Sequence, residues 1–379
     1  MSLIVDEHRE YLSDAVRLNA FRAAIHKTVR PGDVVLDLAS GTGVLGLYAC
    51  EAGAARVYSV EATGMIEVAR AVATANGVGD RVTFIQGYSR HVTLPEPVDV
   101  IVCDQIGHWG FEAGLPGDGG DARDRFLRPG GRFVPGVVDL FIAPVEDAGL
   151  HARVDFWNGR PAGLSFDAVR IWAVNTGYPT MSHPESLLGG AVRIASIDMH
   201  AAITPILTSQ TELTVARAGT LHGIAGWFDA TLADGVHLSN APTATDRVQR
   251  RNVFLPIDRP QPVTPGDLVR VDLHIVPSET LVTWTVEVVR NDAVLARVRH
   301  STMRGMLLTR ADLHRTDPRF VPTLTPRGQA RLSVLELCDG HRPLAEIERE
   351  MLGRHPGLFA SIAEAAVFVG EVVAGYTHS

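Results

Sequence analysis

Cysteine is rare in this sequence, with three residues spread over 379 positions: Cys50, Cys103 and Cys338. An odd number at such wide spacing fits neither a disulfide framework nor a zinc site. Two of the three lie inside apolar runs, where cysteine behaves as a small hydrophobic residue. We therefore expect free, buried thiols and no bound metal.

Long apolar runs are also missing, because no stretch reaches the ~20 residues that a membrane-spanning helix requires. Charged side chains appear early, at Asp6, Glu7, Arg9 and Glu10, a pattern unlike a secretory signal peptide. We expect a cytoplasmic protein without a membrane partner. An excess of positive charge is lacking too, since the formal net charge is -8, which argues against nucleic acid as a partner.

What remains is the composition of a folded globular protein, with 46% hydrophobic and 21% charged residues. A chain of 379 residues is longer than one compact core usually allows. We expect two or three domains.

The most informative stretch is an apolar run, Val34–Leu38, that leads through a glycine turn into a helix beginning near Val44. A short run rich in β-branched residues predicts a strand buried on both faces. Gly41 and Gly43 let the backbone approach a ligand closely, and the helix N-terminus offers it free N–H groups. The sequence therefore predicts a cofactor site at this turn.

Two cofactors fit the turn, because the spacing of Gly41, Gly43 and Gly46 also matches the dinucleotide fingerprint. Asp37 ends the strand just before the glycines, where it would repel a pyrophosphate and attract the ammonium group of a methionine moiety. This favours S-adenosylmethionine (SAM) over NAD. Glu61, at the end of the next strand, would accept the ribose hydroxyls of either cofactor.

Strands and helices alternate from Val34 to about Phe133, which predicts a doubly wound, mostly parallel sheet. The expected strands are 34–38, 57–61, 82–85 and 98–103, and the expected helices are 44–52, 64–76 and 121–127. Ligands bind beyond the carboxyl ends of such strands. The residues that fall there are Ser40, Gly41, Gly43, Glu61, Gly87, Ser89, Arg90 and Asp104.

Two further segments flank this sheet. Residues 7–29 predict a single amphipathic helix with Leu12, Val16 and Ala20 on one face. The glycine-rich stretch 113–120 predicts a mobile loop beside the site, either a substrate lid or a spacer.

The pattern changes after Gly131 to short β-like segments at 137–143, 212–216, 268–275 and 281–289. They predict a β-rich second domain, a barrel or a sandwich. A polar linker, 309–326, then precedes three short helices expected at 332–338, 344–352 and 362–373. These would form a small core of their own or dock on the barrel.

Over residues 5–310 the chain resembles the protein arginine methyltransferases, which are class I SAM-dependent methyltransferases. The stretches that carry the resemblance are Glu10–Arg17, Val34–Leu45, Val60–Glu61, Leu127–Pro135 and Gly219–Phe228. The family implies a Rossmann-like SAM-binding domain, here 1–135, and a β-barrel substrate domain, here 136–310. It also implies a homodimer formed through a helical arm inserted near 166–190.

The resemblance also implies the roles of the cofactor residues. Arg17 would bind the carboxylate of SAM, while Asp37, Gly41 and Gly43 would surround its methionine. Glu61 would hold the ribose. Ser89 and Arg90 occupy the adenine-contacting positions, although the family usually has an acid in place of Arg90. Ser40, Ala62 and Gly87 complete the expected set of cofactor contacts.

The acceptor side departs from the family pattern. Arginine methylation there uses two glutamates on one hairpin, because a planar guanidinium needs paired carboxylates. Here the first position is Asp104, and the second falls on Ala113 with Glu112 one residue earlier. The usual Thr-His-Trp stretch is replaced by residues 245–254.

The hairpin contains a different candidate for the chemistry. His108 is the side chain there whose ordinary pKa lies near neutrality, so we expect it to act as general base, with Asp104 orienting it or the substrate. The alternative is a structural role, in which His108 forms hydrogen bonds with the backbone of a turn. Trp109 and Phe111 are expected to line the pocket wall.

The C-terminal segment 318–379 carries a second resemblance. Leu335–Ile347 is similar to the helical part of PqqD-like domains, which bind leader peptides, and the alternative is a helical cap on the barrel.

Three hypotheses for the function of the whole chain follow from these observations. The first is a SAM-dependent methyltransferase acting on oxygen or nitrogen of a peptide or natural-product intermediate. The second is arginine methylation by Asp104 and Glu112, and the third is a non-catalytic SAM- or peptide-binding partner of another enzyme.

Overall fold

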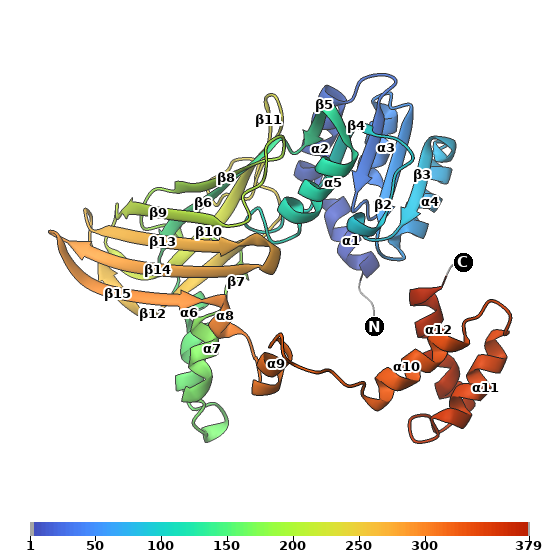
Figure 1. Ribbon diagram of the computed structural model, residues 1–379. Helices are drawn as coiled ribbons and strands as arrows, with labels where there is room; N and C mark the ends of the chain where they lie inside the picture. The colour runs from blue at the N-terminus through green and yellow to red at the C-terminus, as the bar shows by residue number, and fades with distance from the viewer. Residues whose placement is uncertain (1–3, 378–379) are drawn as a thin grey trace. The chain divides into compact units, whose positions relative to one another are not determined.

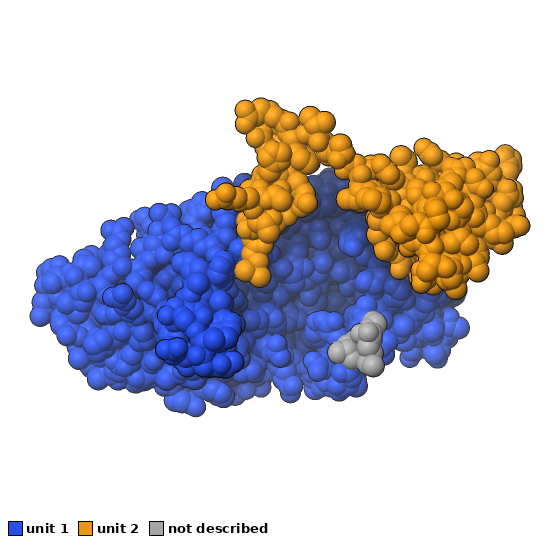
Figure 2. Space-filling model, turned by 90° about the horizontal axis from the view of Figure 1, so that it is seen from below, with its two compact units in different colours: residues 1–306 blue, residues 307–379 orange. Residues whose placement is uncertain are grey.

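The computed structural model describes residues 4–377, which divide into two compact units between Met306 and Leu307. Figure 1 shows the elements of each unit, and Figure 2 distinguishes the units by colour. Across residues 4–377, no helix is both long and apolar enough to cross a membrane. Cys50 and Cys103 are buried free thiols as predicted, whereas Cys338 is half-buried.

The first unit begins with two helices, α1 (Ile4–Ser13) and α2 (Ala15–Thr28), where one continuous helix was predicted. The break lies at Asp14, whose side chain accepts a hydrogen bond from the backbone N–H of Arg17 at 3.1 Å. Asp14 is therefore the N-cap of α2, a position where its carboxylate satisfies a free amide. Its second oxygen accepts from the backbone N–H of Gln249 at 2.8 Å, so a distant loop helps to fix the break.

A five-stranded parallel sheet follows, in the order β3-β2-β1-β4-β5, and confirms the predicted doubly wound fold (Figure 1). The elements are β1 (Val34–Leu38), α3 (Val44–Glu51), β2 (Arg56–Glu61), α4 (Met65–Ala75), β3 (Val82–Gln86), β4 (Val98–Cys103), α5 (Gly120–Phe126) and β5 (Leu127–Val134). The order of the strands reverses between β1 and β4. Ligands bind at such a switch point, beyond the carboxyl ends of the strands.

The glycine-rich stretch expected to be a mobile loop is instead helical and packed. Residues 115–119 form a wide helical turn that continues into α5. Leu115 is fully buried, and a Cβ added at Gly119 would lie 3.0 Å from the side chain of Met199. The prediction was wrong because one apolar side chain and close glycine packing hold the stretch in place.

Two antiparallel sheets form most of the remainder of the first unit, in agreement with the predicted β-rich domain. One has the order β7-β12-β10-β6-β8, with β11 paired to β10, and the other has the order β15-β14-β13-β9. The strands are β6 (Val137–Val145), β7 (Tyr178–Thr180), β8 (Val192–Asp198), β9 (Leu207–Thr214), β10 (Gly219–Ala233), β11 (Val236–Ser239), β12 (Asn252–Val263), β13 (Leu268–Val276), β14 (Leu281–Arg290) and β15 (Ala293–Ser301). Side chains alternate along β13, with Val271 and Leu273 buried and Asp272 exposed, as a sheet with one solvated face requires.

A helical projection interrupts these sheets between β6 and β7 (Figure 1). It contains α6 (Ala148–Asp155), a set of short turns and α7 (Arg170–Val174). The range expected for the arm, 166–190, overlaps α7 and then returns along β7 to pair with β12. Phe156, Leu164 and Ile171 are exposed on the projection. The unit ends with α8 (Thr302–Gly305).

The second unit contains α9 (Arg310–Arg315), α10 (Pro326–Leu337), α11 (Leu344–Arg354) and α12 (Ile362–Tyr376). The last three pack around a core of their own that includes Val334, Met351 and Phe368. α10 begins earlier than predicted because Thr325 caps it, with Pro326 at the first helical position.

Candidate active site

A cavity of about 880 Å³ opens at the carboxyl ends of β1 and β4. Its walls are α1, the junction of α1 with α2, the β1–α3 turn, the hairpin after β4 and the loop 247–251. This volume suits a cofactor-sized ligand. The cavity brings together six of the residues predicted from sequence: Arg17, Ser40, Gly41, Asp104, His108 and Glu112.

The β1–α3 turn depends on its glycines. Gly41 and Gly43 have φ angles of +53° and +76°, in the left-handed region that favours glycine. A Cβ at Gly41 would overlap the imidazole of His8, and one at Gly43 would lie 3.1 Å from the Cβ of Ala69. The side chain of His8 thus brings α1 over the turn, so the N-terminal helix covers this part of the cavity.

Asp37 lies beneath the turn and is buried. One carboxylate oxygen accepts from the backbone N–H of Gly46 at 2.8 Å, and the other has no hydrogen-bond partner within residues 4–377. Burial raises the pKa of Asp37 to about 7, although the hydrogen bond from Gly46 acts to lower it. A buried carboxylate oxygen without a donor is where a ligand's cationic N–H group would be stabilised.

Glu61 ends β2 beside the same turn. Its two oxygens accept from the backbone N–H groups of Gly41 at 3.0 Å and Thr63 at 2.8 Å, and its own carbonyl accepts from Gly87. The Ser40 hydroxyl accepts from Ser59 at 2.7 Å. The carboxyl ends of β1, β2 and β3 are therefore linked by hydrogen bonds.

The expected adenine side lies further from the cavity, along the ends of β2 and β3. Ala62 is half-buried next to Glu61, and Ser89 is buried. Arg90 is exposed and forms an ion pair with Asp118 at 2.9 Å. Asp37, Gly43, Glu61, Ala62, Gly87, Ser89 and Arg90 are not among the residues that line the cavity.

The side chain of Asp104, just after β4, is only 9% exposed and lies between two arginines. Arg17 of α2 forms an ion pair with one carboxylate oxygen, and the terminal nitrogens of Arg250 lie 3.1–3.3 Å from both oxygens. Burial alone would raise the pKa of Asp104, but the attraction of Arg250 and Arg17 outweighs it and holds the pKa below its ordinary value. Asp104 is therefore ionised at neutral pH.

Glu112 turns its carboxylate toward its own hairpin. It accepts hydrogen bonds from the backbone N–H groups of His108, of Trp109 at 3.0 Å and of Phe111 at 3.3 Å. A Cβ at Gly107, where φ is +78°, would lie 2.6 Å from the Glu112 carboxyl carbon. The carboxylate thus fixes the shape of the hairpin, and the second family position, Ala113, has no acid.

His108 lines the cavity and is half-buried. Its Nδ1 atom is buried and has no partner in the described residues, while its carbonyl accepts from the Asn240 side chain at 2.7 Å. Burial lowers the pKa of His108; Glu112 opposes the shift, and Arg250 reinforces it. The imidazole is therefore neutral at pH 7 and able to accept a proton.

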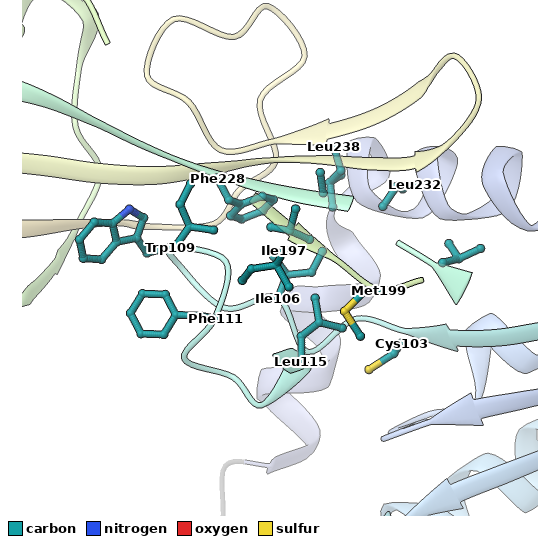
Figure 3. Close-up of a cluster of buried hydrophobic side chains, with 14 of the residues drawn as sticks. Cys103, Ile106, Trp109, Phe111, Leu115, Ile197, Met199, Phe228, Leu232 and Leu238 are labelled. Carbon is teal, nitrogen blue, oxygen red and sulfur yellow. The ribbon is translucent and has the colours of Figure 1, made fainter. Parts of the chain in front are cut away.

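Trp109 and Phe111 were expected to line the pocket wall, and this was wrong. Both are buried in the hydrophobic core, where they lie in a cluster with Ile106 and Phe228 (Figure 3). The indole N–H of Trp109 donates to the carbonyl of Phe141 in β6 at 3.0 Å. Their role is to attach the hairpin to the antiparallel sheets.

Comparisons with known proteins agree with this architecture. A methyltransferase domain matches residues 35–131, and an arginine methyltransferase oligomerization subdomain matches residues 138–284. Protein arginine N-methyltransferase 6 of Xenopus laevis is 32% identical over 295 residues, covering 73% of this chain and 85% of the relative. The chain belongs to the protein arginine methyltransferase family. A further family relative, protein arginine N-methyltransferase PRMT10 of Oryza sativa subsp. japonica, is 30% identical and covers 72% of this chain and 80% of the relative.

Solved structures of the family share the fold. The Trypanosoma brucei PRMT1 enzyme-prozyme heterotetrameric complex with AdoHcy has a TM-score of 0.70 at 20% identity, covering 78% of this chain and 97% of that chain. Arabidopsis thaliana protein arginine methyltransferase 10 has a TM-score of 0.68 at 22% identity, with the same coverage. This confirms a Rossmann-like domain followed by a β-barrel-like domain.

The chain is therefore a SAM-dependent methyltransferase, and the cofactor is SAM rather than NAD. The residues present fit this cofactor. Asp37 offers an oxygen that has no donor within residues 4–377, and Gly41 and Gly43 place no side chain of their own at the turn. The match supports the choice of SAM over a pyrophosphate-containing cofactor, which Asp37 would repel.

Sequence reasoning missed three residues that shape the acceptor side: Asp14, Asn240 and Arg250. The absence of the Thr-His-Trp stretch drew attention to residues 245–254, but no spacing rule indicated that Arg250 would reach Asp104, 146 positions earlier. Asn240 belongs to no motif that would single it out in the sequence. Its importance follows only from its burial and its partners in the fold.

Proposed function

We propose that the chain methylates an oxygen or nitrogen of a peptide or small-molecule acceptor whose reacting group is not a guanidinium. One observation carries this proposal: the carboxylates that would receive a guanidinium are already engaged. Asp104 is paired with Arg250 and Arg17, and Glu112 accepts from its own backbone. A planar guanidinium needs two accessible acceptors in a fixed geometry.

For the cofactor, we propose that Arg17 binds the carboxylate, Asp37 the ammonium group and Glu61 the ribose. The remaining proposed contacts are Ser40, Gly41, Gly43, Ala62, Gly87, Ser89 and Arg90. When bound, SAM supplies the methyl group. The chain's own part is to hold the acceptor in line and to exclude water, and both are consistent with the cover that α1 provides over the glycine turn.

His108 is the proposed general base. Its neutral imidazole belongs to a residue that lines the cavity, and its backbone carbonyl accepts from the side chain of Asn240. It can take a proton from an O–H or N–H group of the acceptor. Asp104, held by its two arginines, would keep the charge of the cavity fixed around that transfer.

The test uses the full chain with SAM and a panel of peptides that differ in one acceptor side chain: serine, aspartate, histidine, lysine or arginine. We expect a mass increase of one methyl group on a non-guanidinium acceptor. Robust methylarginine formation by the wild type would contradict the proposal. S-adenosylhomocysteine binding without turnover on any acceptor would instead support a non-catalytic partner.

A second candidate is arginine methylation, because the relatives are named for it and Asp104 and Glu112 line one cavity. In that case Arg250 would have to leave Asp104 when the substrate enters. Activity of this kind should be abolished by Glu112→Gln.

We also propose a homodimer formed through the projection that contains α6 and α7. Phe156, Leu164 and Ile171 are exposed there, and a second copy would cover them. The oligomerization subdomain match includes this segment. Light scattering at micromolar concentration should give a dimer mass, and a monomer mass would count against the proposal.

A further inference from the structure

The loop 247–251 holds a guanidinium inside the acceptor side of the cavity. The side chain of Arg250 is 12% exposed and that of Asp104 9%. Two terminal nitrogens of Arg250 reach both oxygens of Asp104, and its guanidinium carbon lies 5.8 Å from the ring centre of Phe228. Fork-like contact with a carboxylate and stacking near an aromatic ring are the contacts a bound guanidinium prefers.

The backbone on each side of Arg250 is fixed. The N–H of Gln249 donates to Asp14 at 2.8 Å, and the carbonyl of Arg251 accepts from Asn240 at 2.7 Å. Arg250 therefore lies between two anchored neighbours, and its side chain extends from a loop that cannot easily shift.

Asn240 also ties this loop to the proposed base. It is fully buried, its side-chain nitrogen donates to the carbonyls of both His108 and Arg251 at 2.7 Å, and its oxygen accepts from Phe228. One amide thus sets the position of the loop 247–251 relative to the hairpin. The guanidinium of Arg250 is a fixed part of the acceptor wall.

A cationic acceptor would meet two obstacles at this wall. It would compete with Arg250 for Asp104, and it would approach the positive charge of Arg250 itself. A neutral or anionic acceptor meets neither obstacle.

We propose that Arg250 is a specificity-determining residue: it occupies the carboxylate that a cationic acceptor would need and so restricts the enzyme to neutral or anionic acceptors. The inference rests on the proposed function, since it names the class of acceptor. Removing Arg250 leaves Asp104 paired with Arg17, so the carboxylate does not become an isolated buried charge. The variant site then has room and negative potential for an arriving cation.

The experiment compares two peptides that differ only in arginine or citrulline, its uncharged isostere. Their affinities are measured by titration calorimetry in the presence of S-adenosylhomocysteine for the wild type and for Arg250→Ala. The wild type should bind the citrulline peptide at least as tightly as the arginine peptide. Arg250→Ala should bind the arginine peptide about tenfold or more tightly than the wild type does, with no gain for the citrulline peptide.

Three further variants control the result. Arg250→Gln removes the charge at similar length, and it decides the question if Arg250→Ala does not fold. Arg250→Lys retains a cation and should stay close to the wild type. Arg251→Ala removes a charge from the same loop without touching Asp104, and it should not increase the affinity for the arginine peptide.

A wild type that already prefers arginine over citrulline by about tenfold overturns the inference, as does an uncharged variant with no gain. The binding result is independent of turnover. If the wild type methylates no acceptor but Arg250→Ala gains arginine affinity, the proposed function fails and the inference stands. If the wild type methylates a neutral acceptor but Arg250→Ala gains nothing, the function stands and the inference fails.

Discussion

Two aspartates with largely inaccessible side chains, Asp37 and Asp104, lie at the ends of neighbouring strands and differ in their partners. Asp37 on β1 has an oxygen without a donor in the described residues and a pKa raised to about 7, whereas Asp104 after β4 has two arginine partners and a lowered pKa. Burial acts on both in the same direction, so the partners make the difference. On the cofactor side, Asp37 can therefore accept a cationic group of a ligand. On the acceptor side, Asp104 is already paired with Arg17 and Arg250.

The two sides also differ in how they are built. The cofactor side consists of backbone and side chains from β1, α3 and β2, which are close in sequence. The acceptor side joins α2, the hairpin after β4 and the loop before β12, from Arg17 to Arg250. The first side therefore depends on neighbouring segments of the chain, and the second depends on contacts between distant ones.

The largest effect is expected on the acceptor side, from His108→Ala. Loss of a general base should lower turnover by roughly 10²–10⁴-fold, with the affinity for S-adenosylhomocysteine unchanged. Because burial lowers the pKa of His108, the wild-type rate should fall only below the ordinary histidine range of ~6.5. Steady-state rates across pH would check both. A fully active variant with a flat pH profile would make His108 a structural turn residue.

Local patterns predicted the glycine turn and the positions of Asp37 and Glu61 in the first two strands, while their contacts with the cofactor stay predictions. The same patterns predicted the parallel sheet. They failed at the break in the first helix, where Gln249 binds the cap Asp14, and in residues 115–119, where buried Leu115 overrides the glycine content. These outcomes depend on contacts between distant segments, which periodicity does not report.

The acceptor side was predicted only in outline. Asp104, His108 and Glu112 were located on one hairpin, but the direction of the Glu112 carboxylate depends on three backbone amides of a folded loop. One partner of Asp104, Arg250, belongs to the β-rich part of the chain, far from Asp104 in sequence. The absence of the Thr-His-Trp stretch indicated that residues 245–254 differ from the family, but it did not indicate that Arg250 would contact Asp104.

Substitution of the two aspartates by asparagine should change the free energy of unfolding in opposite directions. Asp104→Asn removes the charge between two buried arginines and should lower the free energy of unfolding by roughly 3–5 kcal/mol. Asp37 binds its proton more tightly folded than unfolded, so it weakens the native state as pH rises from about 4 to about 7. Asp37→Asn should therefore stabilise the ligand-free protein at pH 8, by up to about 4 kcal/mol.

Urea unfolding at pH 8 and pH 5 tests this contrast. The advantage of Asp37→Asn should shrink toward acid pH, where the wild-type carboxyl is protonated in the native state. Equal destabilisation by both variants at pH 8 would mean that Asp37 has a partner in solution.

Cofactor affinity gives the next effect. Asp37→Ala or Gly43→Val should weaken S-adenosylhomocysteine binding by about tenfold or more, close to 1.4 kcal/mol, through loss of the ammonium partner or through strain at positive φ. The wild-type affinity should also rise as pH passes about 7 and Asp37 ionises. Gly64→Ala is the control, because an added Cβ there meets open space. Calorimetry that finds tight NADH binding instead would reverse the cofactor assignment.

The smallest effect is expected from the second unit. We predict that it recognises a peptide, as its resemblance suggested, so a chain ending at Met306 should capture a long peptide substrate several-fold more weakly. The second unit has a hydrophobic core of its own, around Met351 and Phe368, so the truncated chain should keep its thermal unfolding temperature. Methylation of a short acceptor fragment should continue at the wild-type rate. Affinity for matched long and short peptides, measured with both proteins, checks the prediction. If peptide affinity stays intact while the first unit loses stability, the C-terminal helices are a structural cap and the acceptor side of the cavity alone selects the substrate.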